Sequence, residues 1–178
     1  MHKSKWLMLE INFVGGVAVL GSYALGAASH PEAGQLLWGG VPSVIRTVYT
    51  AGMFLAASGY FAFTYFILFR LNPDHTRVTD RIGFGIFTII YTLILLPSAL
   101  WMPLTILTIE QSSVALLWAT RFVLVVVALS SLGLIVALAK VQPRLPLWAY
   151  RVALIGSLFF CFQTVLLDAI VWGSLFQI

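Results

Sequence analysis

Charged residues are scarce in this sequence of 178 residues: they make up 9% of it, against 61% for hydrophobic residues. A water-soluble domain carries about a quarter charged residues. A surface with so few charges cannot face water on all sides, so the composition excludes a soluble globular domain. The basic residues lie in short connections without interleaved aromatic residues, which also argues against a nucleic-acid-binding protein.

The residue types that build common catalytic and redox sites are also few. The single cysteine, Cys161, lies in an apolar run, so neither a Cys-x-x-Cys motif nor an intrachain disulfide can form. The three histidines lie in tails and connections, and no His, Cys, Asp or Glu cluster has the spacing of a metal site. We therefore expect no metal and no resident cofactor, and enzymatic activity is the function that the sequence supports least.

Long hydrophobic runs are what the sequence does contain. A helix needs roughly 20 apolar residues to cross a bilayer core, and five runs reach this length. We predict a single all-α domain over residues 1–178, an integral membrane bundle of five transmembrane helices. The predicted spans cover residues 6–28, 47–69, 82–109, 114–139 and 147–175. A short interfacial helix is expected around Leu36, Leu37 and Trp38.

Positive charges predict how these spans are oriented. They gather at the N-terminus and in the second and fourth connections, at Lys3, Lys5, Arg70, Arg77, Arg81, Lys140, Arg144 and Arg151. The opposite side has Arg46 as its basic residue. Cytoplasmic connections carry the excess of Lys and Arg, so we expect the N-terminus inside and the C-terminus outside. The membrane would be a bacterial inner membrane or an organelle membrane.

Two opposite charges lie deep inside the predicted spans. Counted along their helices at 1.5 Å per residue, Arg121 and Asp168 each lie about 10 Å below the outer boundary. An unpaired charge at that depth would cost several kcal/mol, so we predict an ion pair between them. The pair could fix helix register, or line an outer-side cavity and meet a charged ligand group. The remaining alternative is that Arg121 extends to the membrane interface without a partner. Gln163 lies five residues before Asp168, which places them on different faces of a regular α-helix.

Polar and aromatic residues in the spans allow two interpretations. Asn12 and Gln163 are expected to make hydrogen bonds between helices. Trp148 and Trp172 fit the aromatic belts at the two membrane interfaces. Trp38, Trp101 and Trp118 map toward the outer half, on the side of Arg121 and Asp168. Flat rings near a buried cation would suit a planar amphipathic ligand such as a tetrapyrrole or a sterol; belt and packing roles are the alternative.

Four short motifs, in chain order, resemble the TspO/translocator-protein family. They are Pro42 with Thr47-Val48-Tyr49 and Met53, Leu100-Trp101-Met102-Pro103-Leu104, Leu116-Leu117-Trp118, and Asp168-Ala169-Ile170-Val171-Trp172. Asp168 stands where the family typically has asparagine. The resemblance implies a pocket among the helices, capped by the first connection, for porphyrins or sterol-like molecules. On that mapping the candidate pocket residues are Trp38, Tyr49, Trp101 and Trp118, to which we add Met53, Arg121 and Asp168 as candidate ligand contacts.

Two functions therefore stay open. The first is a small membrane protein that binds or conveys a hydrophobic planar ligand in an outer-side pocket. The alternative is a non-catalytic accessory subunit of a larger membrane complex. Ala18, Ser22 and Gly26 recur every four residues and offer a face for close helix approach. The expected partners are the lipid bilayer, a hydrophobic small molecule, and a second copy or a membrane-complex subunit, with no nucleic acid.

Overall fold

The computed structural model describes residues 2–30 and 33–177 and is all-helical, without a strand among those residues. Five helical stretches are long and apolar enough to cross a membrane. The first is α1, Lys3–Ser29, and the second joins α3, Ser43–Tyr65, to the π-helix η1, Phe66–Arg70. α4, Gly85–Gln111, and α5, Val114–Lys140, follow. The last stretch consists of α6, Leu147–Cys161, the π-helix η2, Phe162–Trp172, and α7, Gly173–Leu175.

The predicted helical class and the five apolar stretches are confirmed. Each predicted span ends within four residues of the observed helix, and the fourth and fifth begin at the predicted residues. Agreement is close because the helices end where the apolar runs end, at turns and prolines. The expected short helix is α2, Ala33–Leu36, so it lies slightly before Leu37 and Trp38, which belong to a turn.

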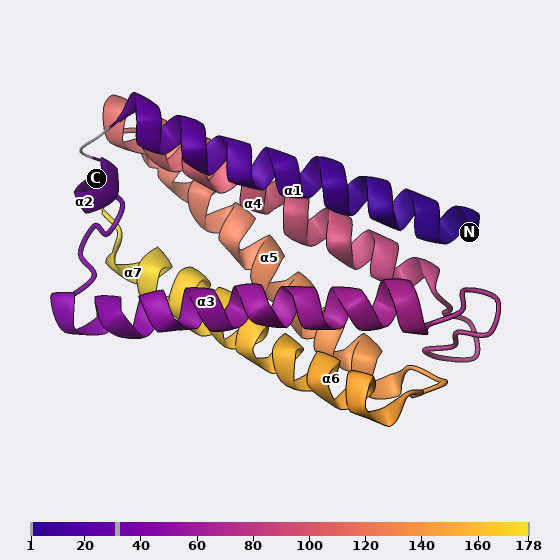
Figure 1. Ribbon diagram of the computed structural model, residues 1–178. Helices are drawn as coiled ribbons and strands as arrows, with labels where there is room; N and C mark the ends of the chain where they lie inside the picture. Colours follow the sequence, from indigo (N-terminus) through magenta and orange to yellow (C-terminus); the bar gives the residue numbers. More distant parts are fainter. Residues whose placement is uncertain (1, 31–32, 178) are drawn as a thin grey trace.

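The helices have a different order in space from their order in the chain. α1 packs against α4, α4 against α5, α5 against α6 and η2, and α6 against α3. α1 and α3 therefore form the two ends of this row. Figure 1 shows α1 and α3 diverging toward the end that carries α2 and α7. We call that end the C-terminal end of the bundle, and the end where α1 begins the N-terminal end.

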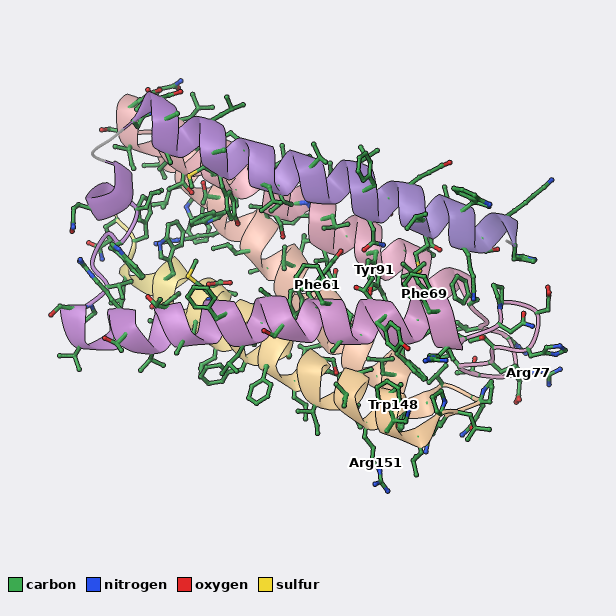
Figure 2. The ribbon with its side chains drawn as sticks, viewed as in Figure 1. Phe61, Phe69, Arg77, Tyr91, Trp148 and Arg151 are labelled. Atoms are coloured by element: carbon green, nitrogen blue, oxygen red, sulfur yellow. The ribbon has the colours of Figure 1, made fainter. Side chains whose placement is uncertain are left out.

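Aromatic side chains fill the N-terminal half of the bundle. Tyr91 points inward from α4 (Figure 2) and shares a hydrogen bond of 2.7 Å with Thr64 on α3. Tyr60 on α3 donates a hydrogen bond of 2.7 Å to Asn12 on α1. The prediction that Asn12 bonds between helices is therefore confirmed. These bonds join α3 to both α4 and α1, so the two ends of the row meet here.

Small residues allow the closest helix contacts. α3 crosses α6 at Gly59 and Gly156, and a Cβ atom added to Gly156 would lie 2.8 Å from the Gly59 Cα. A Cβ on Gly26 of α1 would lie 2.7 Å from Met102 of α4. Of the predicted small-residue face, Gly26 makes this close approach, whereas Ala18 is exposed. The face is thus partly used inside the chain, against α4.

Main-chain pairing joins the connections at the N-terminal end. The Arg77 amide donates to the Gln142 carbonyl at 3.0 Å, and the Gln142 amide donates back at 2.8 Å. This pairing brings the connection before α4 against the connection before α6. Figure 2 shows Arg77 in the first of them and Arg151 pointing away from α6 at the same end. The basic residues of the two connections therefore gather on one end of the molecule.

Candidate ligand site at the C-terminal end

A cluster of aromatic side chains lies at the C-terminal end. We define the aromatic cluster as Tyr23, Trp38, Tyr49, Trp101, Trp172 and Phe176. They come from α1, the turn after α2, α3, α4, η2 and the segment after α7. Apart from Trp172 and Phe176, these rings come from segments far apart in sequence, so the folding of the bundle brings them together.

Trp172 occupies the middle of the aromatic cluster. Its ring stacks on Phe176 with centroids 4.3 Å apart and planes at 14°, and it meets Trp101 edge-on at 5.5 Å. Its indole Nε1 donates to the Leu37 carbonyl at 2.8 Å. Trp172 is 4% exposed, so it does not lie at the surface as the aromatic-belt prediction requires. Trp148, at the other end, is 58% exposed and does lie there.

The connection between α1 and α3 covers one side of the aromatic cluster. Tyr49 is buried and its hydroxyl donates to the Leu167 carbonyl on η2. Its ring meets Trp38 edge-on at 5.7 Å, and the Arg46 guanidinium carbon lies 5.3 Å from the Trp38 ring centroid. The structure thus places Trp38, Tyr49 and Trp101, three of the predicted pocket residues, in one hydrophobic cluster to which this connection contributes Trp38.

Arg121 reaches the edge of the aromatic cluster from α5. A terminal guanidinium nitrogen donates to the main-chain carbonyl of Phe176 at 3.2 Å, and the guanidinium carbon lies 5.1 Å from the centre of the Trp118 ring. The Nε atom is buried and has no hydrogen-bond partner among the described residues. The cation therefore keeps a buried, unpartnered N–H at Nε beside the terminal nitrogen that donates to Phe176.

Asp168 pairs with Gln163 instead of Arg121. The Gln163 Nε2 atom donates to the Asp168 carboxylate at 2.8 Å. In a π-helix the main-chain bonds join residues five apart, so η2 places these two side chains on one face, which corrects the expectation for a regular α-helix. Gln163 also bonds within its own helix, not between helices as predicted.

The predicted ion pair between Arg121 and Asp168 is not formed, since each side chain has another partner. Counted along their helices the two residues lie at similar levels, but the guanidinium bonds Phe176 beyond the end of α7 and the carboxylate bonds Gln163 within η2. The Gln163 side chain lies against Gly52 of α3, and the Asp168 carboxylate lies within electrostatic reach of the Tyr23 and Tyr49 hydroxyls. The π turn therefore directs the carboxylate toward the side of α1 and α3, away from Arg121 on α5.

Met53 and Trp118 lie outside the aromatic cluster. Met53 is 51% exposed because the buried face of α3 follows Tyr49, Gly52 and Ala56, and Met53 falls beside that face. Trp118 is 62% exposed on the outer surface of α5, where it supports Arg121. A ligand inside the aromatic cluster would contact neither the Trp118 ring nor the Met53 thioether unless these side chains moved.

Sequence reasoning did not identify Tyr23 and Phe176 as site residues, and it placed Trp172 at an interface. The spacing of Trp172 and Phe176, four residues apart at the end of an apolar run, is the one signal in the sequence that could have paired them. Nothing in the sequence pattern of the first span distinguishes Tyr23 from an interfacial tyrosine. These residues become visible as a site only through the packing of α1 on α4.

Unpartnered polar atoms accompany the aromatic rings. Among the described residues, the buried atoms without a hydrogen-bond partner include Trp101 Nε1, Arg121 Nε and Gln163 Oε1. A buried polar group left unpaired costs about 1–3 kcal/mol. Two donors and one acceptor could therefore pair with a ligand that has complementary groups, in a region of aromatic and aliphatic side chains.

The outer surface also has two apolar grooves. One, of about 350 Å³, runs between α1 and α4 with Glu10 at its rim, and the other, of about 340 Å³, lies between α4 and α5. Neither groove is lined by a residue of the aromatic cluster, and their linings are almost entirely hydrocarbon. Across the described ranges, no group of three His, Cys, Asp or Glu side chains could hold a metal ion.

Comparisons of the chain with protein-family models, with curated proteins and with solved structures found no match.

Proposed function

We propose that the chain is a multi-pass membrane protein whose N-terminal end faces the cytoplasmic side. The five apolar helices support insertion, and the charge distribution supports the orientation. Eight basic residues lie at the N-terminal end, namely Lys3, Lys5, Arg70, Arg77, Arg81, Lys140, Arg144 and Arg151. Positively charged connections stay on the cytoplasmic side during insertion. The membrane is a bacterial inner membrane or an organelle membrane.

The function proposed for this protein is to bind or convey a hydrophobic planar ligand at the aromatic cluster. The observation that carries this proposal is a set of buried and half-buried rings with unpartnered donors and an acceptor on it or beside it. Aromatic rings contact one another offset-stacked or edge-to-face, and a flat aromatic ligand can make the same kinds of contact with them. The resemblance to the TspO/translocator-protein family supports a tetrapyrrole-like or sterol-like ligand.

A titration of the purified protein with protoporphyrin IX tests this function. Binding beside Trp101 and Trp172 would quench the tryptophan fluorescence, and the quenching would saturate at one ligand for each site. An unrelated multi-pass protein in the same detergent gives the background. Quenching no greater than that background would remove tetrapyrroles as ligands of this protein.

A second candidate function is that of an accessory subunit in a larger membrane complex. It is favoured by α1, because only 6% of its most apolar stretch is buried within the chain. Its outward side chains, Phe13, Val17 and Leu20 among them, are exposed and would be covered by lipid, by a second copy or by a partner subunit. A chain that is monodisperse and stable alone in detergent argues against an obligate partner.

A further inference from the structure

The segment after α7 folds back into the aromatic cluster. Phe176 is 2% exposed, and its amide donates to the Trp172 carbonyl at 2.8 Å, which closes one turn. Figure 1 shows this segment running from α7 toward α2. The Phe176 ring therefore covers the face of Trp172 on which another flat ring could stack.

Phe176 also accepts a hydrogen bond from Arg121. The Phe176 main-chain oxygen accepts a hydrogen bond of 3.2 Å from one terminal guanidinium nitrogen, while Arg121 Nε stays unpartnered among the described residues. A carbonyl oxygen fills one position of the guanidinium fork. A carboxylate has two oxygens and can fill Nε and a terminal nitrogen together, in a charge-assisted pair that is about twice as strong as a neutral hydrogen bond.

Two glycines before α3 make room for this segment. Gly39 has a φ of 51°, in the left-handed region, and a Cβ added there would lie 2.7 Å from the Phe176 ring. A Cβ added to Gly40 would lie 2.6 Å from the Leu175 main-chain oxygen. The connection that caps the aromatic cluster is therefore shaped around Leu175 and Phe176.

We propose that residues 174–176 are an internal occupant of the ligand site, and that the ligand is a planar aromatic acid that displaces them. This inference rests on the proposed function of the aromatic cluster. The ligand ring replaces Phe176 on Trp172, and its carboxylate replaces the Phe176 carbonyl on Arg121. A neutral planar molecule gains the first contact and not the second, so the site selects for the acid.

Binding of protoporphyrin IX and of its dimethyl ester to the full chain tests the proposal. Phe176→Ala removes the internal ring, and we expect it to tighten protoporphyrin IX binding by about tenfold. This is the gain expected if the site of the unaltered chain is open in about one-tenth of the molecules and the variant opens it in all of them. The acid binds the unaltered chain more tightly than the ester, and Arg121→Gln abolishes that preference. A thermal unfolding scan of each variant shows whether it is folded.

A second variant moves the segment without removing a ring. Gly40→Ala pushes against Leu175, whereas Gly34→Ala, in the same connection, meets nothing within 4 Å and serves as its control. Tighter binding by Gly40→Ala than by Gly34→Ala supports the internal occupant, even where Phe176→Ala does not fold. If the unaltered chain binds and neither Phe176→Ala nor Gly40→Ala binds more tightly, the internal occupant is refuted and the ligand site stands. If no form of the chain binds either compound, the proposed function fails with it.

Discussion

Gln163 and Asp168 hold each other across a single π turn, inside a part of the bundle that has few other polar groups. The Gln163 amide donates to the carboxylate, and its oxygen lies against Gly52 without a partner among the described residues. In this setting the carboxylate and the amide each depend on the other for a hydrogen-bond partner. The pair therefore fixes both side chains beside Tyr49 and the rest of the aromatic cluster.

Removing the acceptor from this pair should destabilise the fold. Asp168→Leu leaves the Gln163 amide without a partner, and we expect the free energy of unfolding to fall by about 1–3 kcal/mol. Asp168→Asn keeps a side-chain oxygen as acceptor and should lose less. Unfolding in detergent by a graded denaturant measures both values. Equal stability of Asp168→Leu and the unaltered chain would mean that packing alone holds the π turn.

Single residues also show how far the sequence could lead. Trp38, Tyr49 and Trp101 were predicted as pocket residues, and the structure places all three in one hydrophobic cluster. The Arg121–Asp168 pair was predicted from depth alone, and depth says nothing about the direction a side chain takes around its helix. A π turn changes that direction for every residue after it. The hydropathy of a segment does not reveal whether it contains such a turn.

Helix contacts at the scale of whole elements depend on glycine more than on large side chains. α3 and α6 approach so closely at Gly59 and Gly156 that neither position has room for a Cβ atom. Between apolar helices in lipid, such close contact is a main source of association, because burial of hydrocarbon brings little gain. Tyr49 lies on α3 and η2 continues α6, so this crossing also sets the distance between Tyr49 and η2 on one side of the aromatic cluster.

A methyl group at this crossing should force α3 and α6 apart. Gly59→Ala would clash with the Gly156 main chain, and overpacking of this kind costs about 1–3 kcal/mol. Gly133→Ala, on α5, meets nothing within 4 Å and should leave stability unchanged or slightly higher. Thermal unfolding of the two variants in one detergent compares them. If Gly59→Ala unfolds at the temperature of Gly133→Ala, the crossing is looser than described.

The whole molecule is a row of five apolar stretches whose lengths the sequence predicts and whose neighbours it does not. Length and hydropathy are properties of one segment, so the five stretches could be predicted closely. Neighbour choice depends on which apolar face meets which, and in a chain with 61% hydrophobic residues many faces look alike. No pattern in the sequence predicts that α1 packs on α4 instead of on the next helix in the chain.

Orientation in the membrane can be tested at the same scale. With Cys161 replaced by Ala, Thr79→Cys reports the N-terminal end and Gln111→Cys the C-terminal end; both positions are exposed. We expect a membrane-impermeant maleimide to label Gln111→Cys in intact bacterial cells and Thr79→Cys only after the membrane is opened, because eight basic residues favour the cytoplasmic side. The reverse labelling would contradict the proposed orientation.

The central claim is that the aromatic cluster binds a planar ligand, and one comparison of quenching titrations tests it most directly. Protoporphyrin IX is titrated into the unaltered chain, Trp101→Phe and Trp148→Phe. Trp101 belongs to the cluster, and Trp148 lies exposed at the opposite end. The account predicts saturable binding that Trp101→Phe weakens severalfold and Trp148→Phe leaves unchanged. Equal affinities of all three forms, or stronger loss in Trp148→Phe, would contradict it and locate any porphyrin elsewhere on the protein.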